Sequence, residues 1–317
     1  MLVADVPKVT VDIAPVHSLV SKVMDGVGKA DLIIPAGASP HEYQLKPSNA
    51  KSIEDADIVF WVGEDLTPWL EKGLSSLAQD ASITPLLGVD GIELLSFREG
   101  ALFEAHDHDD HDDHDDHDDH GKKKHDDHDD HDDHGKKKHD DHDDHAHGDH
   151  DPHAWLSPQI AKVWLNVIAA KLSEADPDNA AKYFSNAKLA RDNMDSLVSE
   201  VNSILDPIRD KKFVVFHDAY QYFEKDFGIS ASGAISLGDA SDPSPARLAE
   251  IRKRVVDEAV ECVLAEPQYK QGLVKAVVEG TNANTAVIDP LGVKLDAGAN
   301  LYENLIRNLA TNLAKCF

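Results

Sequence analysis

Three histidines stand where imidazole nitrogens could bind a metal ion. His41 lies in GASPHEYQLKPS, His153 lies in DPHAWLSP, and His217 directly follows the apolar run FVVF. Each has Pro, Asp or Ser beside it, and these residue types favour loops and turns. Three neutral imidazoles, with a carboxylate or water as fourth ligand, form a reasonable zinc site, and nitrogen donors favour zinc over manganese or calcium.

Each of these histidines also has a plainer explanation when taken singly. His41 could be a solvated loop residue, His153 part of a helix cap, and His217 a core histidine that donates to a carbonyl. Asp289 is a further candidate ligand because it follows the strand-like AVI, and ligands of open α/β sheets bind beyond the carboxyl ends of strands. His17 lies in an apparent helix and is expected to be packed or solvated.

A low-complexity tract from about residue 104 to 150 contains fifteen of the chain's nineteen histidines. It holds two copies of HDDHDDHDDHGKKK and a degraded third copy. No apolar residue lies between Ala105 and Ala146, so burial cannot offset the entropy of ordering the tract, and we expect a mobile loop. Its histidines are candidate auxiliary zinc ligands that collect, shuttle or report zinc: His106, His108, His111, His114, His117, His120, His125, His128, His131, His134, His139, His142, His145, His147 and His150. An acidic solubilising loop is the alternative.

The formal net charge of -28 excludes nucleic acid as an expected partner, because the phosphates would be repelled. Between His106 and Asp151, 21 Asp and 6 Lys contribute -15 of that charge. The acidity is therefore largely local, and it fits a cationic or metallic partner.

The elements that must position these side chains alternate between strands and helices. In the first half, HSLVSKVMDGVG has helical spacing between strand-like segments at 8–14, 31–34 and 55–63. After the tract, Ser157 as N-cap and Pro158 at the first helical position predict a helix to about Ser173. The second half has predicted strands at 213–216, 261–265 and 286–288 and predicted helices at 244–259 and 299–315. This alternation is typical of parallel strands joined by crossover helices.

A long helix is predicted between the two halves. From Asp176 and Pro177, apolar residues keep helical spacing for about 28 residues, which corresponds to roughly 42 Å. The chain of 317 residues is long enough for two domains. We therefore expect an α/β protein with an N-terminal lobe at 1–175 that includes the loop 104–150, a linking helix at 176–209, and a C-terminal lobe at 210–317.

Two cysteines, Cys262 and Cys316, give a hint about the compartment. An even count with one member near the terminus suggests a disulfide in an extracellular chain, whereas two buried free thiols are the cytosolic alternative. No apolar run approaches the roughly 18 to 20 residues of a membrane-spanning helix. The first residues, MLVADVPKVTVDI, lack the features of a signal peptide, so we expect that any targeting segment has been removed or replaced.

Several motifs, in order, resemble the solute-binding components of high-affinity zinc ABC importers. They are GASPHEYQLKPS, DADIVFWVG, DPHAWLSP, VVFHDAYQYFEKDFG, CVLAEPQY and IDPLG. The resemblance covers nearly the whole chain outside the tract, and a histidine- and acid-rich insertion between the first two ligand motifs is typical of these proteins. It implies two (β/α)4-like lobes joined by a rigid backbone helix, with the metal in the interlobe cleft.

The resemblance also implies roles for single residues. His41, His153 and His217 match the three histidine ligand positions, and His217 stands where manganese-selective relatives tend to carry a carboxylate. Asp289 matches a fourth position, but Pro40 stands where some zinc binders place a carboxylate. The fourth ligand is left open between Asp289, water and a tract histidine such as His150. The cysteines match a pair that is bridged in similar proteins, which implies the periplasm.

Zinc capture and delivery to an ABC importer permease is thus the predicted function, with a monomer expected and no enzymatic activity. One alternative is a manganese-binding or adhesin-like relative, which metal competition would distinguish. Another is a zinc-dependent hydrolase, because three histidines with an open position also describe a catalytic site. No general-base signature such as HExxH accompanies these histidines.

Overall fold

Two parallel β-sheets form the framework of the protein. The computed structural model describes residues 6–98, 150–236 and 243–317. The first sheet has the strand order β2-β1-β3-β4 and the second the order β6-β5-β7-β8, with parallel pairing throughout. The strands are β1 (Val9–Val11), β2 (Ala30–Leu32), β3 (Ile58–Trp61), β4 (Ser82–Pro85), β5 (Phe213–His217), β6 (Ala234–Ser236), β7 (Cys262–Ala265) and β8 (Asn284–Val287).

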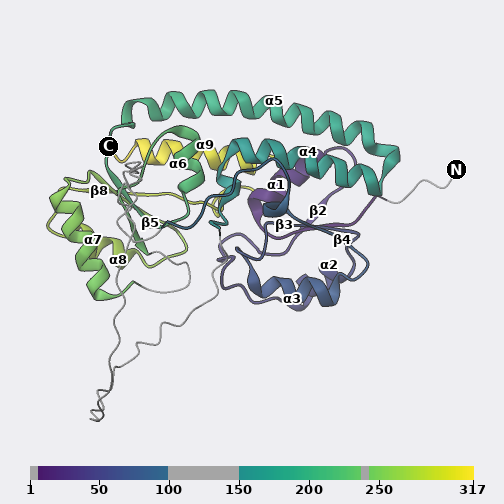
Figure 1. The fold of residues 1–317 in the computed structure, drawn as a ribbon, viewed down its shortest axis with the longest axis horizontal. Helices are drawn as coiled ribbons and strands as arrows, with labels where there is room; N and C mark the ends of the chain where they lie inside the picture. The colour runs from purple at the N-terminus through teal and green to yellow at the C-terminus, as the bar shows by residue number, and fades with distance from the viewer. Residues whose placement is uncertain (1–5, 99–149, 237–242) are drawn as a thin grey trace, which may run out of the picture. The chain divides into compact units, whose positions relative to one another are not determined.

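Each strand is followed along the chain by an α-helix, so both lobes are (β/α)4 units as the sequence predicted. The helices of the first lobe are α1 (Ala14–Val23), α2 (Pro47–Glu54), α3 (Pro68–Leu77) and α4 (Pro158–Ala175). Those of the second are α6 (Gln221–Phe227), α7 (Pro245–Asp257), α8 (Gln271–Val278) and α9 (Leu301–Ala314). In Figure 1, α2 and α3 cover one face of the first sheet, while α1 and α4 lie on the other.

The predicted long helix is α5 (Ala180–Leu205), which extends along both lobes with α4 and α9 between it and the sheets (Figure 1). Short 3-10 turns precede it at Pro177–Asn179 and follow it at Asp206–Ile208. The helix therefore begins later than predicted, because the buried Asp176 carboxylate accepts hydrogen bonds from Asn179 and Tyr183 and closes a tighter turn first. At 1.5 Å per residue, its 26 residues span about 39 Å.

Local signals in the sequence account for several helix ends. The Ser157 side chain accepts a hydrogen bond from the Ile160 N–H, and Pro158 occupies the first turn, as predicted. Ser244 caps α7 in the same way through the Arg247 N–H. The sequence analysis assigned no range to α2, α3, β4, α6, β6 and α8. These elements are short, with 3 to 10 residues each, which is too little for a clear periodicity.

A disulfide joins Cys262 on β7 to Cys316 beyond α9, with the two Cα atoms 5.8 Å apart. This confirms the pairing and ties the C-terminal helix to the second sheet. None of the helices in the described ranges combines the length and the apolar character needed to cross a bilayer. The tract at 104–150 lies outside the described residues except for His150.

Candidate metal centre

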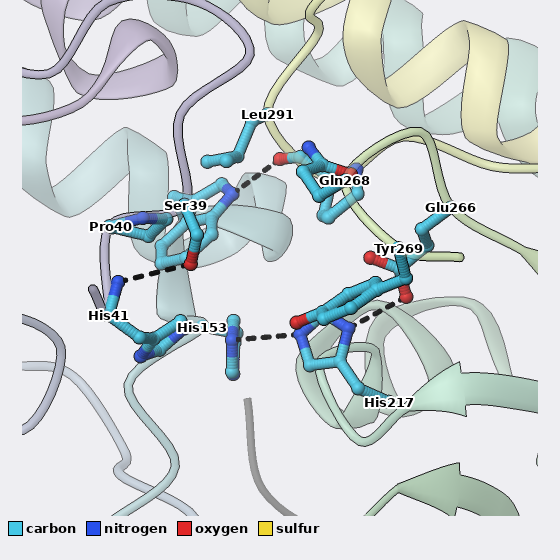
Figure 2. Close-up of a pocket in the computed structure, with 11 residues that line it drawn as sticks. Ser39, Pro40, His41, His153, His217, Glu266, Gln268, Tyr269 and Leu291 are labelled. Atoms are coloured by element: carbon cyan, nitrogen blue, oxygen red, sulfur yellow. Dashed lines mark hydrogen bonds and ion pairs between the residues drawn. The ribbon is translucent and has the colours of Figure 1, made fainter. Parts of the chain in front are cut away.

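The structure brings His41, His153 and His217 together from three distant parts of the chain. One ring nitrogen from each lies within 4.8 Å of the other two. Within the described residues, no other group of three or more His, Cys, Asp or Glu side chains meets this condition. Figure 2 shows the three rings facing one another in a pocket that Trp155 and Tyr269 also line.

His217 is the last residue of β5, and its side chain is held by the neighbouring strand. β5 pairs with β7, with Val214 opposite Val263, and Glu266 is the residue that directly follows β7. The His217 Nδ1 is 2.7 Å from the Glu266 carboxylate, and both residues are buried. A neutral ring that donates through Nδ1 keeps its lone pair on Nε2, the atom that can bind a metal ion. The Nε2 of His217 is therefore directed at the site.

His153 is held from its own loop. Asp151 accepts from the His153 backbone N–H at 2.9 Å, and its Oδ1 lies 2.7 Å from His153 Nδ1. The Asp151 side chain also accepts from the Gln221 amide at 3.1 Å, which fixes the carboxylate in turn. With Nδ1 engaged, the His153 Nε2 points at His217.

The two Nε2 atoms of His153 and His217 are 3.4 Å apart. Nitrogens bound to one zinc ion at their usual distance in a tetrahedron lie about 3.4 Å from each other. This spacing fits a shared ion. The carboxylates on Nδ1 orient both rings, as is usual around zinc.

His41 approaches from the loop between β2 and α2. Its ring centre lies 5.5 Å from that of His153. The loop is anchored where the Trp69 indole donates to the Pro40 carbonyl at 2.8 Å, and where the His41 N–H donates to the Ser39 hydroxyl at 3.3 Å. His41 is half-buried, in contrast to His153 and His217 at 2% and 4% exposure. It stands on the more accessible side of the site.

Aromatic and apolar groups close the pocket around the histidines. Trp155 lies 5.1 Å from His153 and Tyr269 lies 5.4 Å from His217, measured between ring centres. Burial, and then the charge of the nearby Glu266, raises the pKa of Tyr220 well above its usual 10.0, so its hydroxyl stays protonated at neutral pH. Because His153 and His217 are buried, an interaction of their rings with a cation is weakened less by solvent than it would be at the surface.

Asp289 and His150, the candidates for a fourth ligand, lie outside this group. The Asp289 carboxylate accepts from the backbone N–H groups of Leu291, Gly292 and Val293 at 3.1, 3.0 and 2.6 Å, and so it closes a turn. His150 pairs with Ser96 in an isolated antiparallel bridge. The fourth ligand therefore stays a prediction.

His17 is also separate from the group. Its Nε2 lies 2.9 Å from the Ala30 carbonyl oxygen, within the first lobe. The sequence analysis expected a packed or solvated histidine here, and the ring is half-buried. It offers a comparison residue for experiments on the three clustered histidines.

Two important residues were missed from the sequence, Glu266 and Asp151. Glu266 follows β7 directly, so the rule that ligands gather beyond the carboxyl ends of strands could have found it. Asp151 stands two residues before His153, the spacing at which an aspartate commonly accepts from a backbone N–H. The histidines drew attention because they can bind metal, whereas these carboxylates act on the histidines.

Nearly the whole chain is similar to known zinc-uptake proteins. A family model described as the periplasmic zinc-uptake complex component A matches residues 9–316. The high-affinity zinc uptake system protein ZnuA of Brucella abortus is 48% identical over 308 residues, covering 97% of this chain and 91% of that protein. The protein of the same name from Paracoccus denitrificans is 45% identical over 314 residues, covering 99% and 92%.

Solved structures share the fold at lower sequence identity. A crystal structure of ZnuA has a TM-score of 0.75 and 20% identity, covering 98% of this chain and 99% of that one. A manganese-bound solute-binding protein, FpvC of Pseudomonas aeruginosa, has a TM-score of 0.74 and 18% identity, covering 98% and 97%. The laminin-binding protein of Streptococcus agalactiae has a TM-score of 0.72 and 20% identity, covering 98% and 99%.

Proposed function

The chain belongs to the family of periplasmic zinc-uptake components, and on this premise we propose that it captures Zn²⁺ and delivers it to an ABC importer permease. His41, His153 and His217 are the proposed ligands. The observation that carries the proposal is their convergence, with one nitrogen from each within 4.8 Å of the others. Zinc is here the cargo of the protein.

The donor set favours zinc over manganese. All three side chains offer imidazole nitrogen, which suits zinc, whereas manganese prefers carboxylate and water oxygen. The two carboxylates nearest the site, Asp151 and Glu266, contact the Nδ1 atoms of His153 and His217. These carboxylates hold the two rings at Nδ1, so that the Nε2 atoms are directed toward the proposed zinc position.

One site can both capture and release zinc if the ligands on one side of the ion can detach while the others stay fixed. His153 and His217 are buried and braced, while His41 is half-buried on a loop. Zinc would enter and leave on the His41 side, with the fourth position open to Asp289, water or a tract histidine such as His150. The long α5 alongside both lobes opposes a large hinge motion. We therefore propose local loop movement with a modest shift of the lobes.

The chain is proposed to divide into a first lobe at 1–175, a linking helix at 176–209 and a second lobe at 210–317. The protein is proposed to act as a monomer. The histidine- and aspartate-rich tract is proposed to collect zinc at several weak sites. Ordering a segment costs roughly 1 to 2 kcal/mol per backbone residue fixed, and the sequence between Ala105 and Ala146 has no apolar residue to offset that cost. The braced site in the folded lobes avoids most of that cost.

A zinc titration by calorimetry tests the capture proposal. The full chain and a variant that lacks residues 106–149 are each titrated in the presence of a competing chelator. We expect one tight zinc per molecule in both proteins and additional weaker equivalents only in the full chain. Excess Mn²⁺ should not displace the tight zinc. A folded deletion variant without the tight site would instead place a tract residue in the primary coordination sphere.

Delivery is tested separately in cells. A bacterium that lacks its own periplasmic zinc-binding protein but retains the permease is supplied with this chain under zinc limitation. Growth should be restored by the wild type and lost with His217→Ala. Tight zinc binding without any restoration, with a permease from the chain's own source, would contradict delivery while leaving capture intact.

A further inference from the structure

Two short stretches flank the tract and pair with each other. We call Leu95–Arg98 and His150–His153 together the stem. Ser96 and His150 form an antiparallel bridge, and the Asp151 N–H donates to the Leu95 carbonyl at 2.8 Å. The Leu95–Arg98 segment of the stem follows the first sheet along the chain, and the His150–His153 segment ends at the proposed ligand His153. The stem is thus an ordered structure next to the metal centre.

Hydrogen bonds join the stem to helix α6 of the second lobe. The Tyr222 hydroxyl accepts from the Leu95 N–H at 3.0 Å and donates to the Asp151 carbonyl at 2.9 Å. The Gln221 amide donates to the Ser96 carbonyl at 3.0 Å and to the Asp151 carboxylate at 3.1 Å. Both segments of the stem are therefore hydrogen-bonded to the same helix. That helix begins only four residues after His217.

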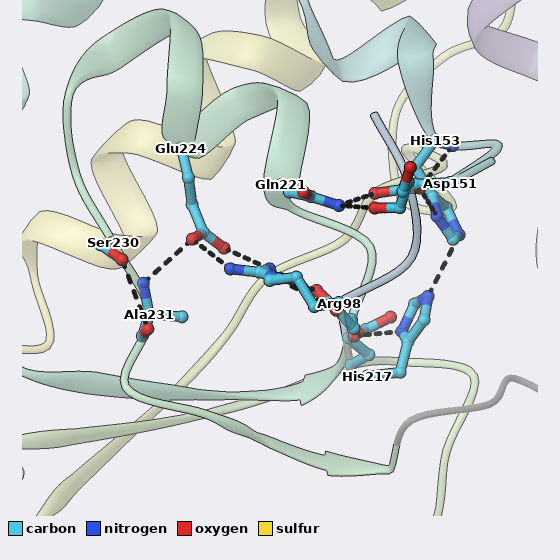
Figure 3. A network of polar contacts seen from close by, with 11 residues as sticks. Arg98, Asp151, His153, His217, Gln221, Glu224, Ser230 and Ala231 are labelled. Atoms are coloured by element: carbon cyan, nitrogen blue, oxygen red, sulfur yellow. Dashed lines mark hydrogen bonds and ion pairs between the residues drawn. The ribbon is translucent and has the colours of Figure 1, made fainter. Parts of the chain in front are cut away.

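Arg98 adds the strongest contacts of this network (Figure 3). Its guanidinium donates to Asp218 through Nε at 3.0 Å and also through Nη2. It donates to Glu224 on α6 through Nη1 at 2.8 Å and Nη2 at 3.0 Å. The Arg98 side chain is 16% exposed and those of both acids 6%. Glu224 also accepts from the Ala231 N–H at 3.0 Å, which extends the network to the loop before β6.

These contacts reach both buried histidines of the site. Asp218 is the residue after His217, so a grip on its side chain restrains the backbone that carries that ring. The α6 helix in turn holds Asp151 through Gln221, and Asp151 holds His153. A single guanidinium thus connects the supports of two ligands that come from different lobes.

We propose that Arg98 is a positioning residue for the zinc site, which keeps His153 and His217 at the nitrogen spacing that zinc requires by fixing α6 and Asp218 to the stem. This inference rests on the proposed zinc-binding function. Arg98 does not contact the metal; it pre-organises the ligands. Loss of such support lets the ligands separate more readily, so zinc should leave faster.

The planar fork of arginine is what the site requires. Arginine can bind two carboxylates at once with several parallel donors, whereas lysine offers a compact charge on a flexible stem. Arg98→Lys therefore keeps the positive charge that the buried acids need and removes the geometry. Gln221→Ala is a second, milder variant, because it removes two of the hydrogen bonds between α6 and the stem, at a partly exposed position, and leaves those of Tyr222 and Glu224 in place.

The test measures zinc dissociation from the full-length protein in a stopped-flow instrument with a chromophoric chelator. Outer-shell partners of metal ligands typically change metal affinity by 10- to 100-fold. We expect Arg98→Lys to raise the dissociation rate about 10-fold and Gln221→Ala about 3-fold, with one tight zinc retained. Association rates should stay within about twofold of the wild type, because the ligands themselves are unchanged.

Arg307→Gln is the matched control. It also removes an arginine–carboxylate pair, with Glu200 at 2.7 and 2.9 Å, but this pair joins α9 to α5 away from the ligand loops. The melting temperature of each zinc-free variant is measured in parallel. Wild-type dissociation rates in both stem variants would overturn the positioning role, as would an equal acceleration in Arg307→Gln. A wild type without tight zinc would instead overturn the proposed function.

Discussion

The two lobes share one topology, but the residues at the ends of their first strands, β1 and β5, differ in type and in contacts. β1 and β5 occupy the same place in the two strand orders. β5 ends at His217, which contacts Glu266, the residue directly after β7, at 2.7 Å. β1 is directly followed by Asp12, and the neighbouring β3 ends at Trp61. Asp12 accepts from the backbone N–H groups of Ile13 and Val62, each at 2.8 Å.

The difference shows how one sheet edge can serve two purposes. In the second lobe the strand end presents a ligand, and the neighbouring strand supplies the carboxylate behind it. In the first lobe the strand end holds a carboxylate that satisfies the backbone of its own loops. The first lobe therefore delivers His41 and His153 from loops, and those loops need supports of their own, such as Trp69 and Asp151.

The largest effect is expected for the ligand at the end of β5. Structural zinc sites bind with about 10 to 16 kcal/mol shared among some four ligands, so His217→Ala should weaken tight zinc binding by about a hundredfold to a thousandfold. His41→Ala and His153→Ala should have comparable effects, measured by competition with a chelator of known affinity. His17→Ala is the control and should change affinity less than twofold. Similar losses in all four variants would remove the assignment of the site.

A smaller effect is expected for the carboxylates behind the ligands. Glu266→Gln keeps the shape but removes the charge that orients His217, and Asp151→Asn does the same for His153. Each should lower zinc affinity about 10- to 100-fold, because outer-shell partners tune the ligands by that amount. Gln79→Glu, at an exposed position two residues beyond the end of α3, is a charge-changing control. If both carboxylate variants bind zinc with wild-type affinity, the carboxylates at Nδ1 of the histidines do not contribute to zinc binding.

The disulfide of the second lobe should matter for stability and hardly for zinc. Cys262 and Cys316 close a loop with a sequence separation of 54, which stabilises the fold by about 4 kcal/mol in the chain-entropy model. Reduction should lower the free energy of unfolding of the zinc-free protein by about this amount, measured by chemical denaturation. Zinc affinity of the folded, reduced protein should change less than twofold. A large loss of affinity would mean that the disulfide helps to position the ligands.

The strand end of the first lobe should affect zinc least of all. Burial raises the pKa of Asp12 from 3.8 to about 7, against the opposing effect of its hydrogen bonds from Val62 and Ile13. Between these two values the folded state binds more protons than the unfolded state, so the free energy of unfolding should fall as pH rises from 4 to 7. Asp12→Asn cannot titrate and should show a flatter dependence over this range.

The stability of Asp12→Asn should also be compared with that of the wild type at a single pH. Asparagine has only one acceptor oxygen, so one of the two N–H groups loses its partner and the variant should be less stable than the wild type at pH 4. Zinc affinity at pH 7 should be unchanged. Parallel pH dependences for the two proteins would show that another group is responsible for the slope.

The sequence by itself determined the candidate ligand types and the fold class. The three histidines, the alternation of strands and helices, the Ser157 cap and the long amphipathic helix are all local patterns, readable because side-chain periodicity and capping depend on neighbours within a few residues. The pairing of Cys262 with Cys316 followed from their number and from the family resemblance.

Only the tertiary structure decided which residues meet. Asp289 follows a strand just as Glu266 does, yet its carboxylate is used by three N–H groups of its own turn, while Glu266 reaches His217 across 49 residues of sequence. The grip of Arg98 on Asp218 and Glu224 spans more than a hundred residues. Such contacts depend on strand register and on loop conformations that satisfy buried polar groups across the whole fold, and no local pattern encodes them.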